Sequence, residues 1–159
     1  VGMYTNIDTD HALEVIATFL ESHPLAEGLP ANALTSALEL IMRCNIFQFG
    51  DTYWRQLCGT AMGTPPAVVY ATLYYAIHEL SMPDRFKACL ALYKRYIDDG
   101  IGIWLSTDPN IWSDFKAWIN SFGSLQWTFV EPAFQVDYLD ITIRIDLDRN
   151  LTTTLYKKN

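Results

Sequence analysis

The chain has 159 residues, 50% of them hydrophobic, and a formal net charge of −7 at pH 7. This length suits one domain with a packed core, and the hydrophobic content excludes a disordered protein. The excess of acidic side chains argues against a free-standing nucleic-acid binder, because the neutralisation of phosphates dominates such affinity.

The apolar runs are too short and too interrupted to span a bilayer, so the sequence predicts no membrane partner. The three cysteines lie far apart and lack the spacing of metal ligands. This usage indicates reduced thiols and an intracellular protein.

Periodicity and turn residues predict the elements of the first half of the chain. Residues 1–7 are expected to form the end of a strand. Apolar side chains at helical spacing predict three helices, over about residues 10–22, 32–44 and 65–80. Gly50-Asp51, between two runs that contain aromatic residues, predicts a hairpin.

The loop of residues 57–66 is the most unusual in the sequence. Gly59 and Gly63 stand four apart with small residues between them, which is typical of a backbone that approaches another group closely. A nucleotide base or backbone would fit there, and a plain strand-to-helix connection is the alternative. His78, near the end of the next helix, is interpreted as a surface residue or a charge partner of the helix C-terminus.

The central stretch is residues 93–104, in which two apolar runs flank Asp98-Asp99. The dipeptide Asp99-Gly100 predicts a tight turn between two strands. Side chains alternate along a strand, so the two carboxylates cannot point the same way. A turn that presents carboxylates suits Mg²⁺, which takes hard oxygen ligands. A purely structural turn is the alternative interpretation.

The last third predicts one more helix and then strands. Asp108 is the expected cap of a helix over about residues 109–122. Alternation predicts strands over residues 125–130, 136–145 and 151–156. The predicted fold is therefore α+β, with an antiparallel sheet that carries the Asp98-Asp99 hairpin and helices packed on one face. The expected core residues are Leu13, Ile16, Leu38, Val69, Leu73, Ile97, Ile103, Phe115, Ile119 and Leu139.

Taken together, short motifs in a fixed order resemble the palm region of a reverse transcriptase, closest to those of Penelope-like retroelements and more distantly to telomerase. Tyr4-Thr-Asn-Ile7 is similar to the end of the first palm motif, and Arg95-Tyr-Ile-Asp-Asp99 is similar to the third. The second motif corresponds to Gln56 with Gly59-Thr-Ala-Met-Gly-Thr64. Downstream blocks correspond to Trp127-Thr-Phe129, Tyr138-Leu-Asp-Ile141 and Thr154-Leu-Tyr-Lys-Lys158. The resemblance covers essentially the whole chain, as a single partial palm domain over residues 1–159.

This resemblance implies an RNA-directed DNA polymerase that uses two Mg²⁺ ions roughly 4 Å apart, with Mn²⁺ as the second candidate ion. Asp98 becomes a metal ligand and Asp99 an accessory one, while Tyr4 becomes a steric gate against ribonucleotides. The residues implied to line the incoming nucleotide and the template are Tyr4, Gln56, Gly59, Met62, Gly63 and Tyr96. Lys157 and Lys158 are implied to meet the primer backbone, and solvated terminal lysines are the alternative.

The chain departs from the family pattern in one respect. By the family's spacing, the first palm motif's carboxylate would stand two places before Val1, and the fingers and thumb segments would flank the chain. The sequence is thus expected to be a fragment whose partners are an RNA template, a DNA primer and a dNTP. Nuclear residence is implied by the resemblance alone. A non-catalytic palm-derived scaffold that binds nucleic acid or protein is the second hypothesis, and an unrelated α+β domain with an acidic turn is the third.

Overall fold

The computed structural model describes residues 2–23 and 29–156, which form an α+β fold as predicted. The helices are α1 (Met3–Asn6), α2 (Thr9–Ser22), α3 (Ala31–Arg43), α4 (Ala67–Glu79), α5 (Met82–Phe86) and α6 (Pro109–Ile119). The strands are β1 (Ile46–Phe49), β2 (Thr52–Arg55), β3 (Leu90–Tyr96), β4 (Asp99–Trp104), β5 (Gln135–Tyr138), β6 (Ile141–Ile145) and β7 (Leu151–Leu155).

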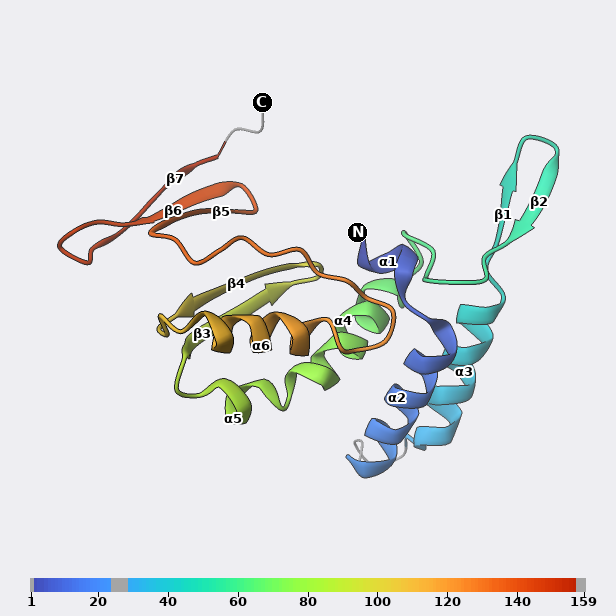
Figure 1. Ribbon diagram of the computed structural model, residues 1–159. Coiled ribbons are helices and arrows are strands. Elements are labelled where there is room, and N and C mark those ends of the chain that lie inside the picture. The colour runs from blue at the N-terminus through green and yellow to red at the C-terminus, as the bar shows by residue number, and fades with distance from the viewer. Residues whose placement is uncertain (1, 24–28, 157–159) are drawn as a thin grey trace.

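The strands are antiparallel, but they are divided among three small sheets rather than joined in one. The described strands pair as β1-β2, β3-β4 and β5-β6-β7. Figure 1 shows the β1-β2 hairpin projecting from the end of α3, away from the other sheets. All its strand residues are exposed, so this hairpin contributes nothing to the core.

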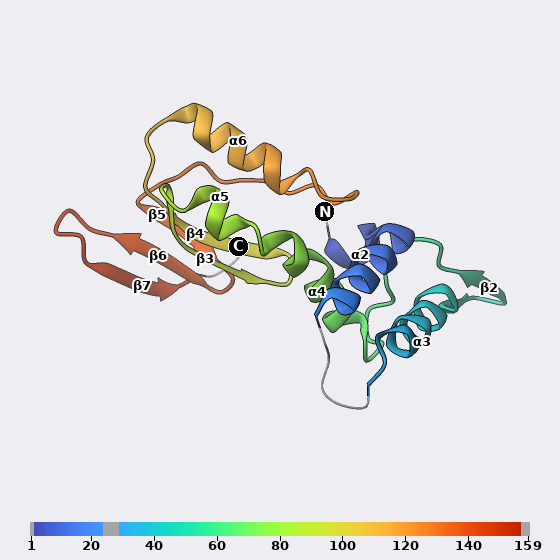
Figure 2. The same cartoon turned by 90° about the horizontal axis from the view of Figure 1, so that it is seen from below.

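Helix α4 is the centre of the packing. Its residues Tyr70, Tyr74 and Tyr75 are fully buried, and Ala71 lets neighbouring elements approach closely. Two of these hydroxyls have partners: Tyr75 donates to the Ile119 carbonyl at 2.9 Å, and the Tyr74 hydroxyl lies 2.6 Å from Nδ1 of His11. The Tyr70 hydroxyl has no partner among the described residues. Because α4 contacts α1 and α2 as well as α5, it joins the helical half of the molecule to the half that carries the β3-β4 hairpin (Figure 2).

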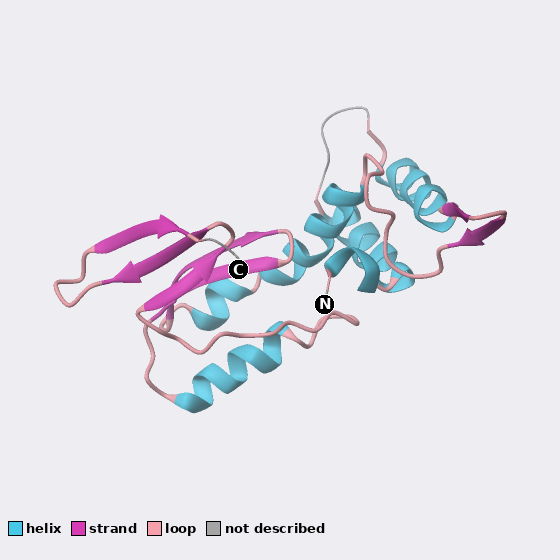
Figure 3. Ribbon diagram, turned by 90° about the horizontal axis from the view of Figure 1, so that it is seen from above, coloured by secondary structure: helices cyan, strands magenta, loops and turns pink. Residues whose placement is uncertain are grey.

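The sequence predicts that helices near residues 10–22, 65–80 and 109–122 pack on one face of the sheet that carries the Asp98-Asp99 hairpin. Helices α4 and α6 do so against β3-β4, together with α5, which the sequence does not predict. Trp104 of β4 contacts Trp112 and Phe115 of α6, with ring centroids 5.0 and 5.2 Å apart. Phe86 of α5 meets Phe115 edge-on at 5.1 Å. The predicted helix at residues 10–22 differs, because α2 packs against α3 and α4 (Figure 3).

His78 lies inside this aromatic layer, so the prediction of a surface residue is wrong. Its ring stacks on Trp118 at 4.1 Å and on Phe122 at 4.6 Å. Its Nε2–H donates to the Trp118 carbonyl at 3.0 Å, because a carbonyl can only accept. Burial lowers the pKa of His78, and the bond to Trp118 opposes that shift only in part.

Three predicted strands are corrected. Met3–Asn6 forms a helical turn instead of a strand, because Met3 is buried and the Asn6 side chain donates back to the Gly2 carbonyl. Residues 125–130 run as irregular chain, tied to α6 by the Asn120 side chain. The predicted strand 136–145 is a hairpin of β5 and β6, which turns at Leu139 with a φ of +54°.

The predicted core is confirmed for seven of its ten residues and wrong for three, of which Val69 lies in α4, Ile103 in β4 and Leu139 in the turn between β5 and β6. Leu13, Ile16, Phe115 and Ile119 are buried, and Leu38, Leu73 and Ile97 pack against that cluster. Val69, Ile103 and Leu139 are exposed at 66, 40 and 42%. Within the described residues, no helix is long and apolar enough to cross a membrane.

The short helix α1 and the loop after β2 are joined through their backbones. The Gly59 N–H donates to the Ile7 carbonyl at 2.8 Å, and the Thr60 N–H donates to the Tyr4 carbonyl at 2.6 Å. Gly59 has a φ of +74°, and a Cβ there would stand 2.2 Å from the Tyr4 carbonyl oxygen. The sequence's prediction of close backbone approach is confirmed at Gly59, although the approaching group is the protein's own chain.

We expect Gly59→Ala to destabilise the fold by more than about 2 kcal/mol, since it adds a backbone clash to the strain of a positive φ. The matched control is Gly63→Ala, where φ is +94° but nothing lies within 4 Å of the added Cβ. That control should cost about 1 kcal/mol. Urea unfolding of both variants measures the difference, and equal losses would contradict the contact.

We expect the stability to fall as the pH drops below about 6.5, the ordinary pKa of an unfolded histidine. The folded pKa of His78 is lowered, so the unfolded chain binds more protons in this range and is favoured. Above about pH 6.5, His78 is neutral in both the folded and the unfolded protein, so its effect on stability vanishes. His78→Phe keeps an aromatic ring in the stack and should flatten this part of the stability profile. An unchanged slope between pH 5 and 6.5 would refute the assignment.

Candidate functional site

The acidic pair lies at the turn of the β3-β4 hairpin, but the turn is not the predicted one. Tyr96 pairs with Asp99, so Ile97 and Asp98 are the two turn residues, and Gly100 lies within β4. Ile97 has a φ of +54°, which is unusual for a β-branched residue and costs roughly 1–3 kcal/mol. Such a conformation persists only when the surrounding structure holds it.

The glycines of the motif serve the packing of the hairpin. Gly100 and Gly102 pair with Arg95 and Tyr93, so all four residues lie on the face toward the helices. A Cβ on Gly102 would come within 2.9 Å of the Leu92 carbonyl, and one on Gly100 would stand 3.4 Å from the Tyr93 hydroxyl. The small residues therefore leave room for the two large side chains opposite them.

Arg95 is the residue that the sequence analysis missed. Its Nε and Nη2 form a bidentate pair with the two carboxylate oxygens of Glu79, at 2.7 and 2.8 Å. Its Nη1 donates to the Ile97 carbonyl at 2.8 Å, and Nη2 also donates to the Thr72 carbonyl at 3.1 Å. The Arg95 side chain is 5% exposed and the Glu79 side chain 15%.

The pair is completed by two tyrosines. The Tyr93 hydroxyl donates to Glu79 at 2.7 Å, and the Arg95 guanidinium lies 5.2 Å from the centroid of the Tyr75 ring. Burial and the Glu79 carboxylate raise the pKa of Tyr93, so its hydroxyl stays protonated as a donor. The sequence does hold a signal for this cluster, because Arg95 stands two residues after Tyr93 and the two side chains therefore share one face of the strand.

Both carboxylates of the acidic pair are free and exposed. Among the described residues, neither the Asp98 nor the Asp99 side chain makes a hydrogen bond or an ion pair. Asp99 shares the outer face with Tyr96, which is 61% exposed. Tyr138 of β5 reaches the main-chain carbonyl of Asp99 at 3.5 Å, the outer limit of a hydrogen bond.

The other predicted site residues within the described chain lie in α1 and in the loop that follows β2. Tyr4 is half-buried, and its backbone joins the Gly59–Thr60 segment. Met62 is 74% exposed and Gly63 has open space around it. The turn of the β3-β4 hairpin lies at the end of the hairpin nearer α1 in Figures 1 and 2, but no hydrogen bond joins it to α1 or the loop within residues 2–23 and 29–156.

The Gln56 side chain bonds to the protein's own backbone. Its side-chain amide donates to the Cys58 carbonyl at 2.8 Å, and it lines a small hollow of about 170 Å³ beside Arg43 and Arg55. Lys157 and Lys158, the predicted primer contacts, lie outside the described residues.

The chemistry of the acidic pair suits Mg²⁺ in kind. Carboxylate oxygens are hard ligands, and Mg²⁺ is usually held by one or two of them together with substrate phosphates. Asp98 and Asp99 supply that number. Within the part of the chain that the structure describes, no cluster of three or more His, Cys, Asp or Glu side chains forms a complete metal site.

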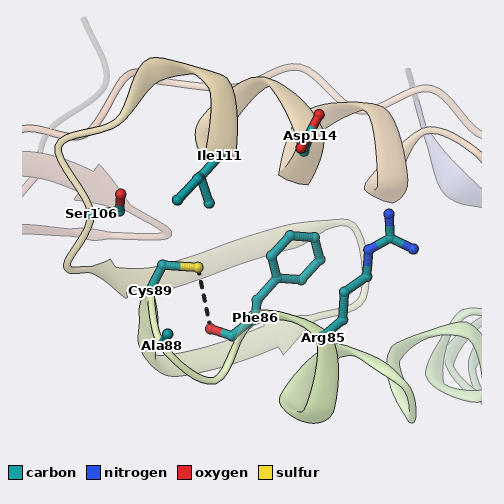
Figure 4. A pocket seen from close by; sticks show the side chains of 7 residues that line it. All are labelled: Arg85, Phe86, Ala88, Cys89, Ser106, Ile111 and Asp114. Atoms are coloured by element: carbon teal, nitrogen blue, oxygen red, sulfur yellow. Dashed lines mark hydrogen bonds between the residues drawn. The ribbon is translucent and has the colours of Figure 1, made fainter.

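A hollow of about 420 Å³ lies at the other end of the hairpin. Cys89 precedes β3 and Ser106 follows β4, so this hollow is remote from the turn. Figure 4 shows Arg85 and Asp114 at one side of it, and Cys89 with its thiol directed to the Phe86 carbonyl at 3.3 Å. Burial raises the pKa of the Cys89 thiol, which favours the unreactive protonated form.

The comparisons with known proteins place the chain in no established group. No protein-family model matches the sequence, and no curated protein and no solved structure matches it either.

Proposed function

We propose that the chain is the palm portion of an RNA-directed DNA polymerase in which Asp98 and Asp99 hold the catalytic Mg²⁺. One observation carries the proposal: among the described residues, the Asp98 and Asp99 side chains have no protein partner, and they stand at a turn where the buried Arg95 side chain holds the carbonyl of the strained residue Ile97. Exposed carboxylates left free on a fixed support are suited to an external cation.

In this proposal each group has a defined task. The bound ions would stabilise the attacking 3′-oxygen of the primer and the leaving pyrophosphate of the dNTP. Asp98 and Asp99 supply negative charge at a fixed position, and the protein otherwise orients its substrates. Tyr4 limits the space beside the sugar, while Gln56, Met62, Gly63 and Tyr96 line the nucleotide and template. Gly59 is buried against the Tyr4 backbone and would support the loop that carries these residues. The further carboxylate and the basic fingers and thumb would come from a longer polypeptide, and a nuclear location would follow.

A non-catalytic palm-derived module is the second candidate. The number of ligands favours it, because two carboxylates alone would hold Mg²⁺ weakly without substrate phosphates. Under this proposal the chain would bind nucleic acid or protein through the same surface without polymerising.

We expect Asp98→Asn to lower primer extension on a primed RNA template by at least about 100-fold in the longer polypeptide, because it removes a charge at the reacting phosphate. The fold should be unaffected, since the Asp98 side chain makes no hydrogen bond to the described protein. Asp51→Asn, in the exposed turn of the β1-β2 hairpin, is the matched control. Undiminished synthesis by Asp98→Asn would refute its role.

Tyr4→Ala should reduce the preference for dNTP over rNTP, since it opens space beside the sugar. Tyr4→Phe keeps the ring and should retain the preference. The measurement is the ratio of kcat/KM for the two substrates in primer extension by the longer polypeptide. Equal ratios for the alanine variant and the unmodified protein would remove the assignment.

A further inference from the structure

We infer that Arg95 is a positioning residue that fixes the acidic turn by holding the Ile97 carbonyl. The role in catalysis rests on the proposed function, but the effect on the turn does not. The guanidinium donates to three different acceptors: the Glu79 carboxylate, the Thr72 carbonyl and the Ile97 carbonyl. Two of them belong to α4, so the turn is tied to the central helix.

The bond to Ile97 acts at the strained residue itself. Ile97 has a φ of +54°, and its carbonyl begins the peptide group that continues into Asp98. A donor fixed on this oxygen sets the orientation of that peptide and with it the direction of the Asp98 side chain. Without the donor, Ile97 would relax toward negative φ, which β-branched residues prefer.

The guanidinium is itself held rigidly. Glu79 binds it in a bidentate fork, the Tyr93 hydroxyl fixes the same carboxylate, and the Tyr75 ring lies against the guanidinium. Four of the hydrogen bonds in this cluster are made by Arg95, whose guanidinium offers five N–H groups in a fixed plane. A lysine offers one compact ammonium group and cannot bridge the same three acceptors.

Two variants of this cluster distinguish an effect on the orientation of the turn from an effect on the stability of the fold. Arg95→Lys keeps a positive charge beside Glu79 and loses the geometry needed to reach Ile97. Glu79→Gln removes the charge and leaves the Arg95 bond to the Ile97 carbonyl in place. Both variants weaken the buried pair, but the inference assigns loosening of the turn to the first alone.

The test is amide hydrogen exchange in this chain, measured by NMR at residues 97–100 and, for comparison, at residues 141–145 in β6. Arg95→Lys should accelerate exchange at the turn by at least about tenfold relative to the unmodified chain, with β6 unchanged. Glu79→Gln should leave the turn within about threefold. Arg43→Lys, in the exposed pair with Asp10 and Glu39, is the control for loss of an arginine.

A second measurement distinguishes local loosening of the turn from a general loss of stability. Thermal unfolding of Arg95→Lys and Glu79→Gln compares their global stabilities. If exchange at the turn followed the unfolding free energy equally in both variants, Arg95 would be merely structural and the inference would be overturned. If the turn loosened as expected while primer extension by Arg95→Lys in the longer polypeptide stayed unchanged, the positioning of the turn would stand and its importance for catalysis would be refuted. If the unmodified longer polypeptide extended no primer, the proposed function would fail and the positioning of the turn would still stand.

Discussion

The buried ion pair between Arg95 and Glu79 is the interaction on which the candidate site depends. Removing a charge pair from water is costly, and such a pair persists only when its geometry is close to ideal and its remaining donors are satisfied. Here the fork is bidentate, and main-chain carbonyls of Thr72 and Ile97 accept further N–H groups. The β3-β4 hairpin is therefore held to α4 by directional bonds as well as by apolar contact.

The aromatic layer supplies apolar surface that is buried between the hairpin and helices α5 and α6. Phe86, Trp104, Phe115 and Trp118 interlock between the hairpin and helices α5 and α6, and His78 stacks within the same layer. Edge-on and offset contacts of this kind add to the free energy of burial. The layer fixes the plane of the hairpin and the Arg95 bonds fix its turn, and the exposed side chains of Asp99 and Tyr96 lie on the opposite face.

The helices could be predicted from the sequence because each carries its own periodicity. The expected helices near α2, α3, α4 and α6 are confirmed within a few residues, and Asp108 caps α6 as predicted, accepting from the Asn110 N–H at 2.8 Å. The short elements could not be predicted in the same way. Residues 3–6 form a helical turn that depends on tertiary contact with the Gly59 loop, and no local pattern encodes that contact.

Local sequence also fails to predict the exact position of the turn in the central hairpin. Asp99-Gly100 is the stronger local turn signal, yet the chain turns two residues earlier, at Ile97-Asp98, despite the unfavourable φ of Ile97. The bond from Arg95 and the need for small residues opposite Tyr93 and Arg95 override local preference. The acidic pair could thus be located from the sequence, while its exact place in the hairpin depends on the contacts of Arg95 with Glu79 and Thr72 of α4.

The central claim is that Asp98 and Asp99 form a cation site, and an NMR titration of this chain with Mn²⁺ tests it most directly. Paramagnetic broadening falls steeply with distance from the ion, so it reports where the ion binds. The account predicts broadening centred on residues 97–100 at millimolar Mn²⁺, lost in Asp98→Asn and retained in Asp51→Asn. Broadening centred on other acidic surfaces, or unchanged by Asp98→Asn, would contradict it.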